Sequence, residues 1–177
     1  MLPVAVLRGN KAILITGIDL IKQKRFGKYD ESIRKLILSP LEVLYLAERG
    51  KISIKDRNKK EYSFEDLVKY FAKYDKNIFP KYLIYRDLTD RGYKVMDGYS
   101  SDIDLLVFDR GDYPEKPAKY RIIGIDEGKP IKIVKILSEL RETLLSKKEL
   151  KIALIERRGE VIYYTVSLLK GGKIDED

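Results

Sequence analysis

The sequence contains no cysteine and no histidine. Without them the chain has no thiol nucleophile and no imidazole base, and it cannot form a disulfide or a zinc site of the His and Cys type. Any chemistry must therefore come from carboxylates, Tyr, Lys, Ser or Thr.

Long apolar runs are also missing. No stretch approaches the roughly 18 apolar residues that span a bilayer, and the first ten residues lack the features of a signal peptide. We expect a cytoplasmic protein that does not contact a membrane. The single Gln and three Asn, beside many Lys, Glu, Ile and Tyr, are typical of hyperthermophile proteins.

The residues that are present can build a folded core. The chain has 177 residues, of which 44% are hydrophobic and 36% charged, so it is long enough for one or two domains and is not a disordered polyelectrolyte. Ser39 and Pro40 mark a helix N-terminus, because Ser caps the first turn and Pro fits the first helical position. Ser63 and Asp66 form the pattern of a second cap. In this half we expect a hairpin, a helix with a basic loop, a helix, a short strand and a helix, over residues 4–15, 17–28, 40–49, 52–54 and 63–73.

A polar, aperiodic stretch over residues 74–80 predicts a hinge between two domains, residues 1–75 and 80–172. Beyond it we expect a helix over 82–91 and strands over 93–96, 103–109 and 120–125. A helix over 131–148 and a closing hairpin over 150–156 and 160–168 follow. The expected apolar side of the second helix consists of Ile133, Ile136, Leu137, Leu140 and Leu144.

The charge is unevenly distributed. Residues 1–80 hold 17 basic and 10 acidic side chains, a net charge of +7, whereas residues 81–177 hold 19 and 18, a net charge of +1. A basic excess attracts polyanions, so the first domain is the better electrostatic candidate for contact with nucleic acid. A Lys-rich surface that keeps the protein soluble explains the same excess.

Residues 82–95, YLIYRDLTDRGYKV, resemble the opening of the catalytic-type domain of archaeal tRNA-intron splicing endonucleases. The resemblance continues through Asp104 and residues 150–164, so it covers nearly all of residues 80–170. Residues 38–50 also resemble a helix of the family's N-terminal domain. The resemblance implies an α/β (α+β) fold: a small N-terminal α/β domain, followed by a nuclease-like C-terminal domain with a mixed sheet flanked by helices.

The resemblance also implies a tetramer that cuts precursor tRNA at both intron ends without a metal. Family members use a Tyr to deprotonate the attacking 2′-hydroxyl, a His to protonate the leaving 5′-oxygen and a Lys to stabilise the transition state. The reaction is general acid–base catalysis with electrostatic support.

Two of the three catalytic positions that the resemblance marks are vacant here. The Tyr position is Phe108 and the His position is Ala118, while Lys148 matches the Lys. A general acid and a general base each contribute about 10²–10⁴ in rate. We therefore expect no catalytic residue and no cleavage by the chain alone. In some archaea the enzyme is a heterotetramer of two catalytic and two non-catalytic subunits, and we expect this chain to be the non-catalytic, structural subunit that acts with a catalytic partner on precursor tRNA.

Arg141, Lys147 and Lys148 are candidate RNA-binding residues. Some catalytic subunits of the family have, at the position of Arg141, an Arg that stacks on a base, a use that suits a guanidinium plane. Each residue also has a plainer interpretation. Lys147 and Lys148 suit a helix C-terminus because they complement the macrodipole, and Arg141 suits a solvated helix face.

Asp104 is present although the neighbouring catalytic positions are changed, and we expect it to cap backbone amides near the turn at Gly98. A magnesium site formed with Asp102 and Asp109 is an alternative. However, strand alternation places Asp109 on the opposite side from the other two carboxylates. We therefore expect no metal site and no cofactor.

The closing hairpin is where this family forms its dimer. The last apolar run, residues 161–169, would be a template for aggregation unless something covers it. Burial within its own domain is the alternative, but that would cover only part of the strand. The candidate subunit-interface residues are Glu156, Glu160, Tyr163, Thr165, Ser167 and Leu168.

Two other functions remain open at this point. The chain could be an active nuclease with an unfamiliar base such as Tyr113 or Tyr99. It could also be a stand-alone RNA-binding module of nuclease ancestry, which predicts a monomer with salt-sensitive RNA affinity.

Overall fold

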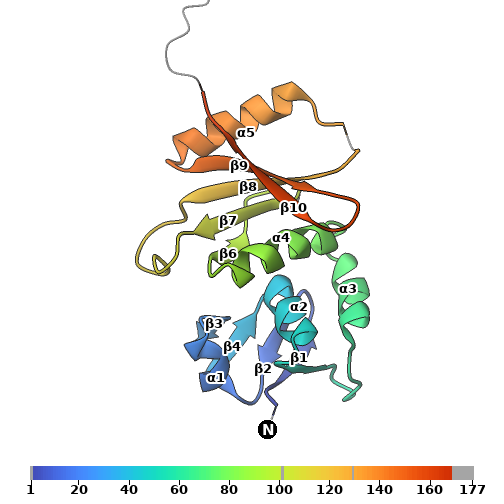
Figure 1. Cartoon of the computed structure of the whole chain (residues 1–177). Helices are drawn as coiled ribbons and strands as arrows, with labels where there is room; N and C mark the ends of the chain where they lie inside the picture. Colours follow the sequence, from blue (N-terminus) through green and yellow to red (C-terminus); the bar gives the residue numbers. More distant parts are fainter. Residues whose placement is uncertain (1, 101, 129, 169–177) are drawn as a thin grey trace, which may run out of the picture. The chain divides into compact units, whose positions relative to one another are not determined.

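The computed structural model describes residues 2–100, 102–128 and 130–168, and the chain divides into two compact units between Tyr82 and Leu83. The division falls within helix α4 (Ile78–Asp90). Each unit contains a five-stranded mixed sheet with helices against it (Figure 1). The expected α+β fold is therefore confirmed. Leu169 and the predicted domain end at residue 172 lie outside the described residues.

The sheet of the first unit has the order β3-β4-β2-β1-β5. Its strands are β1 (Val4–Arg8), β2 (Lys11–Leu14), β3 (Lys28–Asp30), β4 (Lys35–Leu38) and β5 (Ser53–Lys55). Only β1 and β5 are parallel. The predicted hairpin of β1 and β2 is confirmed. Strands β3 and β4 were not predicted, because a short apolar run alone does not distinguish a strand from a helix.

The helices of the first unit are α1 (Ile18–Gln23), α2 (Pro40–Glu48) and α3 (Phe64–Ala72). Ser39 with Glu42 and Ser63 with Asp66 form complete capping boxes at the starts of α2 and α3, as predicted. Helix α2 packs against β2 and α3, and α1 packs against β4. The largest fully buried side chains of this unit include Leu14, Leu36, Leu38, Leu41, Leu44, Ile54, Leu67 and Phe71.

The sheet of the second unit has the order β10-β9-β8-β7-β6. Its strands are β6 (Lys94–Asp97), β7 (Asp104–Phe108), β8 (Tyr120–Asp126), β9 (Glu149–Ile155) and β10 (Val161–Val166). The only parallel pair is β8 with β9, and helix α5 (Ile133–Leu145) connects them. Strand β10 is an edge strand, so its outer side has no strand neighbour among the described residues.

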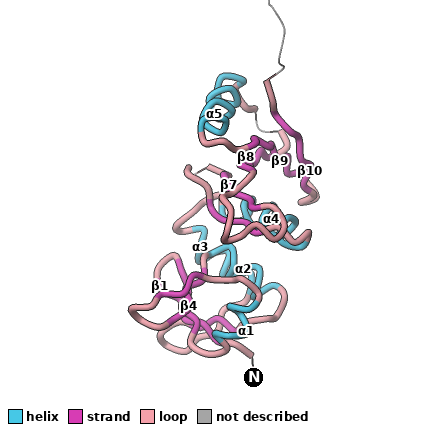
Figure 2. Tube along the Cα trace, turned by 90° about the vertical axis from the view of Figure 1, so that its left-hand side faces the viewer, coloured by secondary structure: helices cyan, strands magenta, loops and turns pink. Residues whose placement is uncertain are grey.

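Helices α4 and α5 cover opposite faces of this second sheet (Figure 2). Ile123 of β8 packs with Leu140 of α5. The next residue, Gly124, faces the other way, because a Cβ there would lie 2.9 Å from a side-chain carbon of Ile84 in α4. Strand alternation therefore assigns each residue of β8 to one helix or the other.

Helix α4 begins four residues before the predicted start at Tyr82, so Ile78, Phe79 and Pro80 belong to a helix and not to the expected hinge over residues 74–80. Pro80 is tolerated because it lies in the first turn, where its missing N–H breaks no helical hydrogen bond. Within the described ranges, no helix combines the length and the hydropathy that a membrane span requires.

The expected apolar side of α5 is only partly covered by its own sheet. The helix is shorter than expected, and among its residues only Leu140 and Thr143 are buried. Ile133, Leu137 and Leu144 are 74%, 53% and 46% exposed. Leu140 packs with Ile123 and Leu150 of the sheet, and Ile136 lies beside the same two residues. The other three residues of the expected side remain exposed.

Candidate functional site

The three positions expected to correspond to a catalytic triad lie at one end of the second sheet. Phe108 is the last residue of β7, Ala118 precedes β8 and Lys148 precedes β9. Two backbone hydrogen bonds join these ends: the Lys119 amide donates to Val107 at 2.9 Å, and the Glu149 amide donates to Lys119 at 3.0 Å. Strands β7, β8 and β9 are adjacent, so the fold brings the three positions together.

The environment of Phe108 is aromatic and basic. Its ring meets the ring of Tyr113 edge-on, with 5.1 Å between centroids and 78° between planes. The ammonium of Lys94 lies 5.3 Å from the centroid of Tyr113, and Lys94 pairs with Phe108 across β6 and β7. Ala118 is only 7% exposed. Tyr99, the other proposed base, precedes the opposite end of β7. That end, at Asp104, lies four residues from Phe108, which is roughly 13 Å along the strand.

The pKa values of two charged groups beside these positions are shifted so that both groups stay charged at neutral pH. The hydrogen bond from the Arg110 amide, with that from Lys119, lowers the pKa of the Asp109 carboxyl. Hydrogen bonding to Tyr120 and then to Asp109 raises the pKa of Lys119 above its usual value. The Asp109 carboxylate therefore stays ionised and Lys119 stays protonated at neutral pH. Neither is poised to exchange a proton, as a general acid or base must.

Cations lie over tyrosine rings at this end of the sheet. The ammonium groups of Lys119 and Lys151 lie 5.1 and 4.9 Å from the centroid of Tyr120. The guanidinium of Arg110 lies 4.9 Å from the centroid of Tyr93. Such cation–π pairs present positive charge beside flat aromatic surfaces, a combination that suits single-stranded nucleic acid.

Asp104 caps the turn that follows β6, as the sequence predicted. Its Oδ2 accepts hydrogen bonds from the amides of Tyr99 and Ser100, at 3.0 and 3.1 Å. The backbone of Gly98 approaches so closely that a Cβ there would lie 2.2 Å from Oδ1 of Asp104. Any side chain at position 98 would therefore displace the carboxylate.

Arg121 is the partner of Asp104 that the sequence did not reveal. Both side chains are almost fully buried, and the guanidinium donates to the Asp104 carboxylate through Nε at 3.2 Å and Nη2 at 3.0 Å. Two carboxylates of α5 complete the network, Glu139 at 2.7 Å and Glu142 at 3.3 Å. Burial lowers the pKa of Arg121, but its bonds to Asp104 and the charges of Glu139 and Glu142 outweigh burial and raise it. The network fixes β7, β8 and α5 to one another.

The carboxylates considered for magnesium are each paired with a different cation. Asp102 contacts Lys135 at 2.7 Å, Asp109 contacts Lys119 at 3.2 Å, and Asp104 contacts Arg121. In the described part of the chain, no group of three or more potential ligands is arranged to hold a metal ion.

The three RNA-binding candidates do not all lie together. Lys147 and Lys148 form the turn between α5 and β9, where Lys147 has a φ of 55° and the ammonium of Lys148 donates to the Ser146 carbonyl at 3.1 Å. Arg141 lies one turn or more away, on the exposed side of α5. There it lines a groove of about 380 Å³ with Leu137, Leu140, Leu144, Leu145 and Leu168. Arg141 therefore lies in the same groove as Leu168, just after the last strand of the hairpin.

The interface candidates in the closing hairpin differ in their surroundings. Glu156 and Glu160 flank the exposed turn of β9 and β10, closed by a hydrogen bond from the Glu156 amide to the Glu160 carbonyl at 2.9 Å. Tyr163 turns toward its own unit, where its hydroxyl donates to Asp87 of α4 at 2.8 Å. Thr165 accepts a hydrogen bond from Lys151 at 3.0 Å. Ser167 and Leu168 are exposed.

Strand β10 exposes two apolar residues, Ile162 and Tyr164, that were not among the interface candidates, and the candidate Leu168 follows the strand. Ile162 and Tyr164 are 39% and 52% exposed, and Leu168 is 62% exposed. They alternate with Tyr163 and share the α5 side of the sheet with Val166, which packs against Leu140. We call the exposed residues on this side the β10–α5 surface: Ile162, Tyr164 and Leu168, with Leu137, Leu144 and Leu145 of α5. The alternation of residues along the strand was the signal that could have found Ile162 and Tyr164.

Comparison with known proteins finds similarity to tRNA intron endonucleases along most of the chain. The family model described as the tRNA intron endonuclease N-terminal domain matches residues 5–68, and that of the tRNA intron endonuclease catalytic C-terminal domain matches residues 78–163. A tRNA-splicing endonuclease of Methanococcus maripaludis is 35% identical over 154 residues, 87% of this chain and 86% of that protein. A tRNA-splicing endonuclease of Thermococcus kodakarensis is 32% identical over 151 residues, 85% of this chain and 87% of that protein.

Proposed function

Because this chain belongs to the tRNA intron endonuclease family, through both its N-terminal and its C-terminal domain, we propose that it is a non-catalytic subunit of a tRNA-splicing endonuclease. Two copies would assemble with two catalytic subunits in the cytoplasm and position them on precursor tRNA. One observation carries the proposal: Phe108 and Ala118 lie at the same end of the sheet as Lys148, and neither side chain has a proton to exchange.

The expected loss of rate is large. A general base and a general acid each contribute about 10²–10⁴, and the chain has no histidine at any position to take over either role. Lys148 can still stabilise negative charge, but one electrostatic group does not move the protons that strand cleavage requires. A chain of this kind contributes to splicing only beside a subunit that carries both groups.

The β10–α5 surface supports a partner subunit. Its six large apolar side chains come from β10, the residues just after it and α5, and Leu137, Leu144, Leu145 and Leu168 line a common groove. Soluble monomers rarely expose so many apolar side chains in one patch, and an uncovered edge strand invites pairing with another chain. A related subunit that adds its own last strand to β10 would cover both features.

The decisive experiment mixes this chain with a family member from the same organism that has Tyr and His at the two vacated positions. We expect intron excision from precursor tRNA by the mixture and none by this chain alone. Size-exclusion chromatography of the mixture should give a single species containing both chains. Equal cleavage by the isolated chain and the mixture would contradict the proposal, and a monomer that ignores the second chain would favour a stand-alone RNA-binding module.

Contact between Phe108 and Tyr113 favours a second candidate, an active nuclease with Tyr113 as the base. This candidate predicts that the isolated chain cuts precursor tRNA and that Tyr113→Phe abolishes the cut. Tyr99→Phe is the matched control, because it removes an exposed phenol near the opposite end of β7. Under the proposed non-catalytic role, the mixture cuts equally well with either variant.

A further inference from the structure

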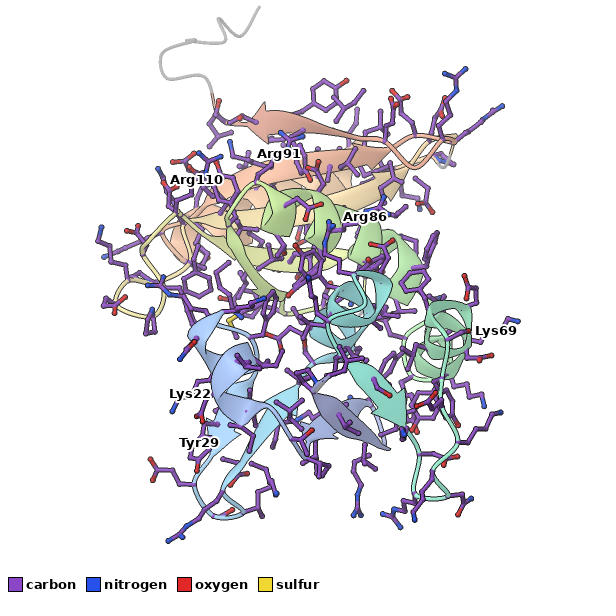
Figure 3. The ribbon with its side chains drawn as sticks, turned by 60° about the horizontal axis from the view of Figure 1, so that its bottom comes forward. Lys22, Tyr29, Lys69, Arg86, Arg91 and Arg110 are labelled. Atoms are coloured by element: carbon purple, nitrogen blue, oxygen red, sulfur yellow. The ribbon has the colours of Figure 1, made fainter. Side chains whose placement is uncertain are left out.

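The first unit carries a dense group of exposed cations beside its edge strand β3. Between Lys22 and Lys28 the chain has four basic residues and no acidic one. We define the β3-edge cluster as these four cations, which are exposed, and the neighbouring Tyr29: Lys22, Lys24, Arg25, Lys28 and Tyr29. Figure 3 shows Lys22 and Tyr29 on one side of this unit and Lys69 of α3 on the other.

The backbone that carries the cluster is held in place by buried groups. The amide of Gly27 donates to Oε1 of Glu42 at 3.0 Å, and Glu42 is 7% exposed. A Cβ at Gly27 would lie 2.6 Å from Cγ of Leu36, so only Gly fits against this part of the core. The ring of Phe26 lies 5.6 Å from that of Tyr45. Lys24 and Arg25 therefore project from a fixed loop, and Lys22 and Lys28 from the helix and the strand that the loop connects, so binding costs little backbone ordering.

The exposed lysines of the cluster can meet an anion. Lys24 forms no ion pair with any carboxylate in the described part of the chain, and the ammonium of Lys22 lies 4.8 Å from the centroid of Tyr29. The acid that follows the cluster, Asp30, accepts hydrogen bonds from the hydroxyl and amide of Ser32. The hydroxyl of Ser32 is the main cause that lowers the pKa of Asp30, and the charge of Lys28 is the smallest one, so this carboxylate is engaged mainly in its own turn.

We propose that the β3-edge cluster binds the phosphate backbone of precursor tRNA, with Tyr29 as a stacking surface for a ribose or base. Spaced cations neutralise successive phosphates. Tyr29 is 38% exposed and carries the Lys22 ammonium over one ring face, so a base would stack on the other face. A protein partner fits less well, because charged residues are depleted at the centre of protein interfaces. The identity of the RNA rests on the proposed role in tRNA splicing.

Three substitutions test the cluster, Lys24→Gln, Arg25→Gln and Lys28→Gln together. The measurement is the affinity of the isolated chain for a labelled intron-containing precursor tRNA transcript, over a series of salt concentrations. We expect at least about a tenfold loss at low salt and a fall of about 2 in the slope of log affinity against log salt. The matched control removes three exposed lysines elsewhere in the same unit, Lys51→Gln, Lys69→Gln and Lys73→Gln. Equal losses in the two triple variants, or no loss in the cluster variant, would overturn the inference.

Tyr29 has its own test. Tyr29→Leu should weaken RNA binding about 5- to 100-fold if a base stacks there, whereas Tyr29→Phe should bind like the original chain. Equal affinity of the Leu and Phe variants would remove Tyr29 from the site.

Partner binding separates this inference from the proposed function. The cluster variant should still assemble with the catalytic subunit and support cleavage at saturating RNA. If it loses the partner and keeps its RNA affinity, the cluster is a docking site for an acidic protein segment and the inference fails. If the original chain binds RNA through the cluster but activates no subunit, the proposed function fails and RNA binding stands.

Discussion

The two edge strands β3 and β10 show how one chain can present two different surfaces. Strand β3 has three residues, two of them charged, and Lys22, Lys24 and Arg25 precede it closely. Strand β10 has six residues and exposes Ile162 and Tyr164. Short, charged edges discourage pairing with another strand, whereas long apolar edges favour it. The first edge therefore suits a solvated polyanion, and the second suits another protein chain.

The largest loss of stability is expected inside the second sheet. The comparison of the two edge strands depends on this sheet being intact. Arg121→Met leaves the buried Asp104 carboxylate without its guanidinium, and breaking a buried pair in this way costs about 3–5 kcal/mol in the free energy of unfolding. Denaturant unfolding of the isolated chain measures it. Lys116→Met is the control, because its pair with Asp112 is on the surface, where solvent screens such pairs and they contribute little to stability. Equal unfolding midpoints for the two variants would show that the network does not hold the sheet.

The next effect concerns the partner. Tyr164→Lys or Leu168→Lys should weaken binding of the catalytic subunit about 10- to 100-fold, because burying one large apolar side chain contributes about 1.5–3 kcal/mol. The free energy of unfolding of the isolated chain should barely change, because both side chains are exposed there. Ile15→Lys, at a 44% exposed apolar residue of the first unit, should leave partner affinity unchanged. A similar loss with Ile15→Lys would mean that β10 has no special role.

Much of the fold could be predicted from the sequence because the signals are local. Ser39 and Ser63 cap helices through residues three positions away, and the hairpins follow from apolar runs around turns. The exposure of α5 could not be predicted in this way. Periodicity identifies an apolar side of a helix, but it does not say whether the sheet of the same chain or another chain covers that side.

Part of the candidate site could likewise be predicted from the sequence, and part of it could not. The positions of Phe108, Ala118 and Lys148 at one sheet end follow from strand order, and the cap by Asp104 follows from a nearby turn. Arg121 was missed because its contact with Asp104 depends on the register of β7 and β8, in which Arg121 lies opposite Leu106 and diagonal to Asp104. Sequence spacing alone does not fix that register.

Tyr163 provides a prediction for the inner side of β10. Burial, followed by its hydrogen bond to Asp87, raises the pKa of the Tyr163 phenol. The unfolded chain releases this proton near pH 10 and the folded chain keeps it, so the free energy of unfolding falls as the pH rises above about 10. Tyr163→Phe should cost about 1.5 kcal/mol at pH 7 and should flatten that alkaline decrease. Urea unfolding at neutral and alkaline pH measures both, and an unchanged alkaline decrease in Tyr163→Phe would contradict the assignment.

The smallest change in stability is expected at β3. This prediction tests the comparison of β3 with β10 most directly. The triple Gln variant of Lys24, Arg25 and Lys28 should change the free energy of unfolding by less than about 0.5 kcal/mol, because all three side chains are exposed and substitutions at exposed sites rarely do more. Its loss should appear in RNA affinity alone, whereas Tyr164→Lys should lose partner affinity and keep RNA affinity. Measuring both affinities for both variants completes a two-by-two test. If each variant weakens both, the two edges do not act as separate surfaces, and the assignment of RNA to β3 and protein to β10 is wrong.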